Sequence, residues 1–255
     1  MSHIVACYKW VLDEGDIRFH NDRTLDIKGA KKKISEYDRN AIQLAVALSE
    51  ASGARPVGLT CGDGSAQQSF RDALSRGLAE TFLVDITGAE EPNGVVTARA
   101  LAKGVEAIGD VSYVICADAS SDDYGRQTGA RLAARLGLPY IGLVCEASLE
   151  GETLTVVRKL DKELETVQVT GPAVLSILPE TIAPTIPGLK ALVAAAKKPS
   201  RIFTAAELNV DLTPSSRTVD CLAYVMERKN ILLNEDTMEK KVEVLLADLH
   251  REGVL

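Results

Sequence analysis

Polar residues that could bind an anion are concentrated in residues 118–128, directly after the apolar run Tyr113–Ala117. The apolar run predicts a buried strand, and the residues after the polar segment predict a helix that ends at Gly137. Backbone N–H groups at the start of a helix are unpaired and favour negative charge, so this connection could hold a phosphate. Hydroxyl, amide and guanidinium donors for such a ligand are supplied by Ser120, Ser121, Arg126, Gln127 and Thr128.

The remaining residues of this segment qualify that interpretation. Ala117, Ala119 and Gly125 are small and allow a ligand to approach the backbone closely. Asp122 and Asp123 would repel an adjacent phosphate, so we expect them to cap a helix or to bind a ribose hydroxyl. A nucleotide site and a well-capped connecting loop are both open from these residues alone.

Two other loops are expected at the same edge of the sheet. Cys7 lies near the end of the first apolar run, and the loop Cys61–Ser65 follows another apolar run, Pro56–Cys61. In an open parallel sheet, ligands bind outside the carboxyl ends of the strands, where the strand order reverses. We therefore expect these loops to converge with residues 118–128.

Sequence motifs for common catalytic sites are missing. The chain has no G-x-x-x-x-G-K-[ST] phosphate loop, no G-x-G-x-x-G after a strand and no G-x-S-x-G elbow. His3, His20 and His250 fall in three separate predicted elements, so no metal site is expected. The chain is expected to bind a ligand and not to catalyse a reaction by itself.

Composition excludes several other classes of protein. The net charge of −7 and the 4% of aromatic residues disfavour a nucleic-acid surface. The five cysteines include no C-x-x-C pair, which indicates reduced thiols in a cytoplasm-like compartment. No window approaches the roughly 20 apolar residues of a membrane span, and no leader pattern is visible. We expect a soluble, cytoplasmic and unprocessed protein.

The elements that must position these loops alternate along the first part of the chain. Apolar runs at 3–11, 56–61, 81–86 and 113–117 predict strands, and amphipathic segments between and after them predict helices, several ending at glycine. Ser35 and Asp38 predict a capping box at the first helix, and residues 17–27 predict a surface hairpin. This alternation predicts an α/β fold with a doubly wound, mostly parallel sheet.

The pattern changes after Pro139. Residues 139–178 alternate with period two, and the segments VVRKL and ETVQV predict an antiparallel hairpin. Prolines interrupt residues 178–187, and a short helix is predicted over 189–196. We expect an α/β nucleotide-binding domain over residues 1–200. We expect residues 201–255 to form a linker and an amphipathic helix, which is predicted over 236–250.

Six segments in this order and spacing resemble the β subunit of electron transfer flavoproteins, most closely its Fix-type branch. They are CYKWVLDEGDIRF, KISEYDRNAIQLAV, GLTCGDG, ADASSDDYGRQTG, ELETVQV and IPGLKALVAAAKKP, and the resemblance covers residues 1–208. It implies an adenine-nucleotide α-hydrolase-like fold and a heterodimer with an α subunit, which carries most contacts to a shared redox FAD. It also implies an adenine nucleotide in this chain: AMP, or a second FAD in electron-bifurcating members.

The resemblance also implies which residues form the sites. The exposed loop around Ile186 is implied to dock a flavin dehydrogenase, such as an acyl-CoA dehydrogenase, and the C-terminal arm is expected to dock on the α subunit. Lys159 stands where the family has an acidic residue, Ser35-Glu36 where it has Asn-Pro, and Arg126 where a small or amide residue is common. The implied nucleotide contacts are Cys7, Ser35, Glu36, Tyr37, Asp38, Cys61, Ala117, Asp118, Ala119, Ser120, Ser121, Asp122, Asp123, Tyr124, Gly125, Arg126, Gln127 and Thr128.

Three functions remain open at this point. The first is an electron-carrier subunit between flavin dehydrogenases and a downstream acceptor. The second is a subunit of an electron-bifurcating flavoprotein, with FAD in this chain. The third is a stand-alone adenine-nucleotide-binding module.

Overall fold

The structure, a computed structural model, describes residues 2–90, 92–224 and 228–255. Met1, the first residue of the expected α/β domain, and residues 91 and 225–227 of the chain lie outside the described residues. The chain divides into two compact units. The first comprises Met1–Arg18 and Asp26–Cys221, and the second comprises Phe19–Leu25 and Leu222–Leu255.

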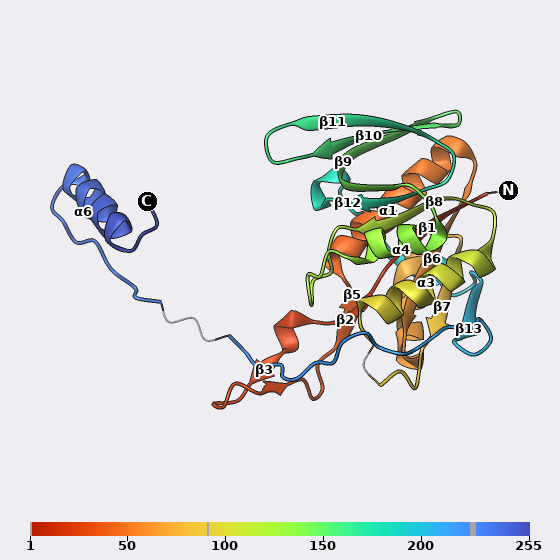
Figure 1. Ribbon diagram of the computed structural model, residues 1–255, viewed down its shortest axis with the longest axis horizontal. Coiled ribbons are helices and arrows are strands. Elements are labelled where there is room, and N and C mark those ends of the chain that lie inside the picture. Colours follow the sequence, from red (N-terminus) through yellow and green to blue (C-terminus); the bar gives the residue numbers. More distant parts are fainter. Residues whose placement is uncertain (1, 91, 225–227) are drawn as a thin grey trace. The chain divides into compact units, whose positions relative to one another are not determined.

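A nine-stranded sheet forms the centre of the first unit, in the order β11-β10-β9-β12-β8-β1-β6-β7-β13 (Figure 1). In this order, each strand from β9 to β13 pairs in parallel with its neighbour. The other two pairs, β9 with β10 and β10 with β11, are antiparallel. The predicted α/β class with added antiparallel strands is therefore confirmed. The strand bounds are β1 His3–Cys7, β6 Arg55–Gly62, β7 Glu80–Asp85, β8 Val111–Ala117, β9 Tyr140–Glu150, β10 Thr153–Lys159, β11 Leu164–Thr170, β12 Ala173–Ile177 and β13 Ser200–Thr204.

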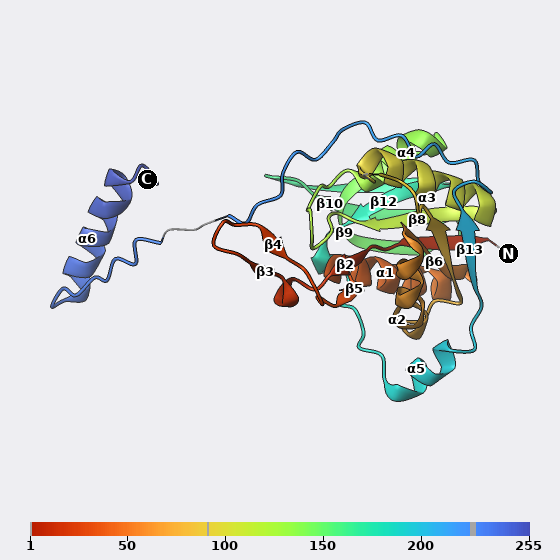
Figure 2. The same ribbon diagram turned by 90° about the horizontal axis from the view of Figure 1, so that it is seen from below.

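Helices cover both faces of this sheet (Figure 2). α3 (Gly94–Ile108) and α4 (Thr128–Leu136) lie on one face, and α1 (Glu36–Ser52) and α2 (Phe70–Ser75) lie on the other. The short helix α5 (Leu189–Ala195) packs against α2. Alternation along β1 divides the core accordingly: Ile4 and Ala6 pack with the α1 side, whereas Val5 and Cys7 pack with the α3 side.

The predicted first strand, residues 3–11, is wrong in its extent. β1 ends at Cys7, and Trp10–Leu12 forms a separate strand, β2, which pairs antiparallel with β5 (Lys32–Ile34). The chain leaves the main sheet where the backbone N–H of Lys9 donates a hydrogen bond to Asp38 Oδ2 at 2.7 Å. The break therefore comes from a contact with a residue distant in sequence.

Shorter elements complete the first part of the chain. The expected hairpin over 17–27 is present as β3 (Arg18–Phe19) and β4 (Leu25–Asp26), preceded by the 3-10 turn η1 (Glu14–Asp16). The helix predicted between the apolar runs at 56–61 and 81–86 is a 3-10 segment, η2 (Gly64–Ser69), followed by α2. A third 3-10 turn, η3 (Pro179–Thr181), begins the proline-rich loop.

The segment after residue 200 contains a strand that the sequence analysis did not anticipate. β13 pairs in parallel with β7, with Ser200 opposite Thr81 and Thr204 opposite Asp85. The first unit accordingly continues to Cys221.

Within the second unit, Thr24 pairs with Leu222, and α6 (Met238–Arg251) forms close to its expected position. Among the described residues, no helix has the length and apolar character that crossing a membrane requires.

Candidate functional site

A pocket of about 390 Å³ lies at the carboxyl ends of β1, β6 and β8 in the first unit. The three loops expected to converge here all line it: Cys7 from β1, Cys61 from β6, and the segment after β8. Its volume falls near the lower end of the roughly 300–1,000 Å³ usual for small-molecule sites. Parallel strands end on one edge, so residues far apart in sequence meet in one cavity.

The structure brings most of the implied contact residues to this pocket, but not all of them. Those that line it are Cys7, Asp38, Cys61, Ala117, Asp118, Ala119, Ser120, Asp123, Gly125, Arg126, Gln127 and Thr128. Those that lie outside its lining are Ser35, Glu36, Tyr37, Ser121, Asp122 and Tyr124. Several of this second group instead hold the lining residues in place.

Sequence reasoning missed one wall of the pocket, which the start of α3 supplies. Asn93, Gly94 and Thr97 line it from that helix, and Tyr8, Lys9 and Trp10 line it beyond the end of β1. A signal for the helix start was present, because asparagine before an apolar helical run is a favoured N-cap. The loop after β7 also begins at this edge of the sheet, but it was not among the loops that were expected to converge there.

Two helices begin at the pocket. The Asn93 side chain caps α3, accepting hydrogen bonds from the N–H groups of Val95 (3.0 Å) and Val96 (3.3 Å). Gln127 directly precedes α4, and a Cβ built on Gly94 would lie 3.8 Å from Gln127 Oε1, so the two helix starts are neighbours. Both helices turn their positive ends to the same cavity, which favours a bound anion.

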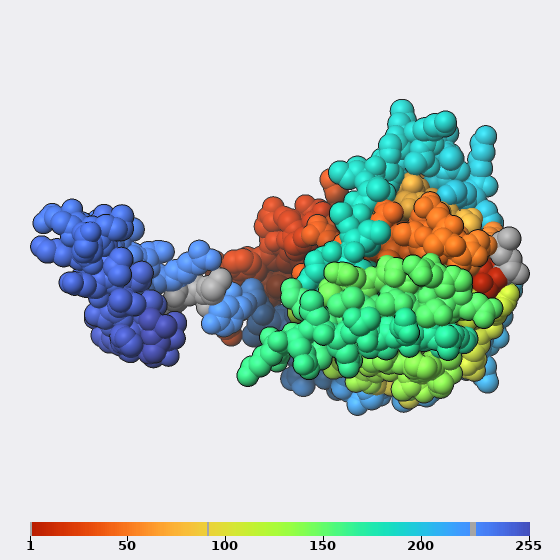
Figure 3. All heavy atoms as spheres, turned by 90° about the horizontal axis from the view of Figure 1, so that it is seen from above, coloured from red at the N-terminus to blue at the C-terminus, as the bar shows by residue number. Residues whose placement is uncertain are grey.

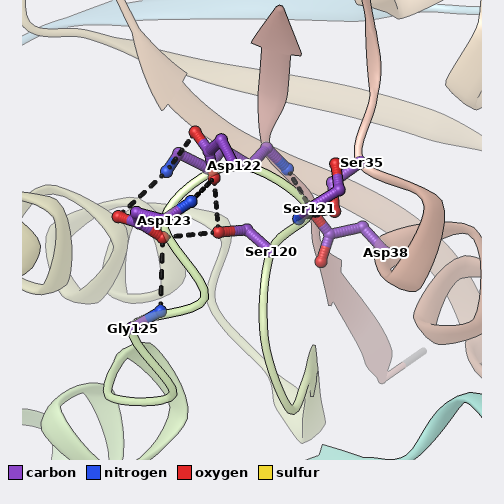
Figure 4. A network of polar contacts seen from close by, with 8 residues as sticks. Ser35, Asp38, Ser120, Ser121, Asp122, Asp123 and Gly125 are labelled. Carbon is purple, nitrogen blue, oxygen red and sulfur yellow. Dashed lines mark hydrogen bonds and ion pairs between the residues drawn. The ribbon is translucent and has the colours of Figure 1, made fainter. Parts of the chain in front are cut away.

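A network of charged side chains fixes the loop after β8 (Figure 4). Lys9 Nζ lies 2.7 Å from Asp122 Oδ2 and 3.3 Å from Asp123 Oδ2. Ser120 Oγ lies 2.6 Å and 2.7 Å from the Oδ1 atoms of the same two carboxylates. The expectation that these aspartates cap a helix is wrong, because α4 starts after Gln127 without a side-chain cap. Their position is set by Lys9 instead, and a ribose contact stays a prediction.

The second cation of the pocket is also paired. Arg126 Nε donates to Asp118 Oδ2 at 2.7 Å, and Asp118 Oδ1 lies 3.3 Å from Ser176 Oγ. Arg126 and Tyr124 have φ values of 54° and 50°, a backbone region that is costly for residues other than glycine. Because Lys9 and Arg126 are both neutralised by carboxylates, the helix ends supply the unpaired positive potential of the pocket.

Ser35 and Asp38 join α1 to this loop. Ser35 is fully buried, and its Oγ accepts a hydrogen bond from the N–H of Ser121 at 3.2 Å. It makes no side-chain cap to α1, so the predicted capping box is wrong. Asp38 accepts from Lys9 N, as described above, and these two contacts tie the start of α1 to both pocket loops.

The remaining predicted residues lie outside the pocket lining. Glu36 Oε1 lies 3.2 Å from Lys33 Nζ, and the Tyr37 ring packs edge-on against Tyr124 with ring centres 5.9 Å apart. Ile186 is 95% exposed in the loop between η3 and α5, away from the pocket lining.

Burial changes the ionisation of several pocket residues. It raises the pKa of Asp38 to about 7 and the pKa of Cys61 to about 11. A hydrogen bond with Cys116, together with burial, raises the pKa of the Cys7 thiol well above its ordinary value. The thiols of Cys7 and Cys61 therefore stay protonated near neutral pH and are poor nucleophiles. Within the described residues, no cluster of three or more His, Cys, Asp or Glu side chains could hold a metal ion.

Comparison with known families identifies the domain to which most of the chain corresponds. The model of the electron transfer flavoprotein domain matches residues 23–208, which is most of the chain. The matched region extends from the turn between β3 and β4 to the turn after β13, and it contains the loop after β8 and the proline-rich loop.

Proposed function

The chain belongs to the electron transfer flavoprotein family, and on that basis we propose that it is the β subunit of a heterodimeric electron transfer flavoprotein. In this proposal the pocket binds an adenine nucleotide, and an α subunit contributes most of the contacts to an FAD shared by the two chains. That FAD supplies the electron-carrying chemistry when it is bound. The heterodimer passes electrons from a flavin dehydrogenase, such as an acyl-CoA dehydrogenase, to a downstream acceptor in the cytoplasm.

The observation that carries the nucleotide assignment is the pocket where the starts of α3 and α4 meet three strand ends. Helix N-termini suit a phosphate, and Asp38 and Asp123 offer carboxylate acceptors for hydroxyl or amino groups of a nucleoside. The volume of about 390 Å³ favours a mononucleotide over a dinucleotide. We therefore propose AMP in this chain, with a second FAD, as in electron-bifurcating members, as the alternative.

A second observation supports the assignment as a subunit. α6 buries none of its side chains among the described residues, although its apolar stripe includes Met238 (70% exposed) and Leu246 (45% exposed). Within its own unit this face is left uncovered, and an exposed apolar stripe of this kind is typical of a surface that binds a partner. The α subunit is the partner that this proposal provides.

The proposal is tested by co-expressing the chain with its α subunit and releasing the bound molecules with acid. We expect a yellow heterodimer that yields one FAD and one AMP. A heterodimer without flavin would contradict the proposed function. Two flavins and no AMP would replace the AMP assignment with the bifurcating alternative.

A pair of variants tests whether the pocket is the nucleotide site. Thr97 lines the pocket from the regular helix α3, so Thr97→Trp should fill the cavity without disturbing the loops. We expect this heterodimer to retain its FAD and to lose AMP. The matched variant Thr97→Ser keeps the hydroxyl and should retain both. Equal AMP contents in the two variants would place the nucleotide elsewhere.

Size-exclusion chromatography separates this proposal from the stand-alone binding module. A module would be a stable monomer that binds AMP by itself. The β subunit should instead co-elute with the α subunit when the two are mixed, because the apolar stripe of α6 is then covered by the partner.

A further inference from the structure

An extended segment follows the turn after β13, and we name residues 208–217 the strap. Its side chains alternate, and Leu208, Val210 and Leu212 pack against the core on the α3 side of the sheet. Figure 2 shows this blue segment running past α3 and α4, and Figure 3 shows it at the border of the first unit. The family match ends at residue 208, so most of the strap lies beyond the matched region. The strap nevertheless belongs to the same compact unit as the pocket.

Arg99 of α3 holds the middle of the strap. Its Nη1 donates to the carbonyls of Asp211 and Thr213, at 3.3 Å and 2.7 Å, and lies 2.9 Å from Asp211 Oδ2. Asp211 Oδ1 accepts from the N–H of Thr213 at 2.9 Å, so the guanidinium binds a turn that the strap itself closes. A charged donor with three acceptors on one short segment fixes where the strap crosses the helix.

Beyond this turn the strap reaches Asn93, a residue of the pocket wall. Asn93 Nδ2 lies 3.4 Å from Ser215 Oγ, and it lies 3.4 Å and 3.1 Å from the carbonyl oxygen and the Oγ of Ser216. The other end of the same amide, Oδ1, accepts from the two N–H groups that it caps at the start of α3. Within the described part of the chain, the strap supplies every acceptor of Asn93 Nδ2. An amide that is bonded at both ends is fixed in one orientation.

We infer that the strap is a positioning element of the pocket, which acts through Asn93 to hold the start of α3 where it binds the phosphate of the nucleotide. The inference rests on the proposed function, because that function makes this pocket the nucleotide site. The positive end of a helix favours an anion only within its first turn, so a small change in its direction weakens the interaction. Loosening the strap should therefore speed the loss of nucleotide before it unfolds the chain.

A strap that only covered apolar surface of α3 would act differently. Its loss would lower the stability of the whole unit in proportion to the apolar area exposed, without a particular effect on the pocket. Ser215 and Ser216 are exposed, so this part of the strap buries little surface. Its contacts are polar and lie at the end of the helix that lines the pocket, which favours the positioning role.

The test uses the AMP-loaded heterodimer and measures how fast bound radiolabelled AMP is replaced by unlabelled AMP. Arg99→Met removes the guanidinium that holds the strap, and we expect release to become about fivefold faster or more. Lys103→Met is the matched variant, because Lys103 lies one turn further along α3 and pairs with Glu106, at 2.7 Å, instead of the strap. Its release rate should stay within about twofold of the parent. Equal release rates in these two variants would overturn the inference.

A second pair of variants acts directly on Asn93. Ser215→Ala/Ser216→Ala removes two hydroxyl acceptors of its Nδ2, whereas Ser215→Thr/Ser216→Thr keeps both. We expect the alanine pair to release AMP about threefold faster or more, and the threonine pair to match the parent. Equal rates for the two pairs would overturn the role assigned to Asn93.

Hydrogen exchange separates positioning from general destabilisation. In Arg99→Met the capped amides of Val95 and Val96 should exchange about fivefold faster or more, while amides in the middle of α3 keep the parent rate. Faster exchange along the whole helix, with an equal fold-change in the unfolding equilibrium, would assign the strap to packing alone and overturn the inference. By reciprocity, AMP should slow exchange within residues 208–217 of the parent. A parent heterodimer without AMP would instead contradict the proposed AMP site.

Discussion

Asp38 is the residue whose ionisation is most changed among the pocket carboxylates. Its side chain is only 7% exposed, and burial raises its pKa from the ordinary value of 3.8 to about 7. Lys9 opposes this shift through the hydrogen bond from its backbone N–H and through its charge, whereas the charge of Asp122 adds to it. Near neutral pH, Asp38 therefore exchanges between a neutral donor and a charged acceptor, both within the pocket.

This shift makes stability depend on pH in a defined direction. Between pH 3.8 and about 7 the folded chain keeps a proton on Asp38 that the unfolded chain has lost, so stability falls as pH rises through this window. Asp38→Asn removes this dependence and keeps an acceptor for Lys9 N. From pH 5 to pH 8, we expect the free energy of unfolding of the variant to gain about 2 kcal/mol relative to the parent. Urea denaturation at the two pH values measures the difference.

Asp63→Asn is the matched control, because Asp63 also lines the pocket but has a lowered pKa. Hydrogen bonds from the Ser65 side chain and backbone are the main causes of that lowering. Both test pH values lie above it, so this variant and the parent should change in parallel between pH 5 and pH 8. Parallel curves for Asp38→Asn as well would contradict the assignment of a raised pKa to Asp38.

At the scale of elements, the pocket depends on how closely α3 approaches the sheet. Gly104 faces β6 and β7, and a Cβ built there would lie 2.9 Å from Leu59 Cδ1 and 3.0 Å from Val84 Cγ2. The missing side chain allows the helix to pack tightly, and this position fixes where Asn93, Gly94 and Thr97 meet the pocket.

Gly104→Ala should therefore destabilise the chain, even though alanine is the better helix former. We expect a loss of about 1–3 kcal/mol in the free energy of unfolding from overpacking, together with weaker AMP retention as the start of α3 shifts. Gly94→Ala, on the same helix, would place its Cβ no closer than 3.8 Å to a neighbouring atom, Gln127 Oε1, and should stay within about 0.5 kcal/mol of the parent. A stabilised Gly104→Ala would show that α3 can move without cost.

Local sequence signals were sufficient for most elements of the first unit. Several helices were predicted to end at glycine, and Gly53 and Gly137 adopt the left-handed conformation after α1 and α4, with φ values of 71° and 65°. The antiparallel pairing of β10 with β11 also followed from period-two alternation, and Val157 lies opposite Thr166 as part of that hairpin. These features depend on neighbouring residues, which a sequence displays directly.

Features that depend on distant residues could not be predicted in this way. Ser35 and Asp38 have the spacing of a capping box, but their side chains bond Ser121 and Lys9, which lie elsewhere in the sequence. The same contact with Lys9 ends β1 early. β13 is only five residues long and becomes a strand because the edge of β7 is available to it. In each case a tertiary hydrogen bond overrides the local pattern.

At the scale of the whole molecule, buried apolar surface is distributed unequally along the chain. Every buried member of the two core clusters lies at or before Ala205, on one face or the other of the sheet. α6 has no buried side chain, and exposed apolar residues are frequent after residue 218, including Val219 (95%) and Leu232 (80%). The first unit therefore carries its own core, and the described residues of the C-terminal segment form no buried apolar cluster of their own.

This distribution predicts that truncation after Cys221 separates folding from assembly. Because the core lies within the retained residues, the free energy of unfolding should stay within about 0.5 kcal/mol of that of the full chain. Binding to the α subunit should weaken by at least about tenfold, since the apolar stripe of α6 is lost.

Leu246→Asp places a carboxylate within the stripe and should weaken binding in the full chain, whereas Ala247→Asp places one on the opposite face of α6 and should not. Calorimetric titration with the α subunit measures the affinity of the full chain, the truncated chain and the two aspartate variants. Equal affinities for the two aspartate variants would show that the stripe does not face the partner.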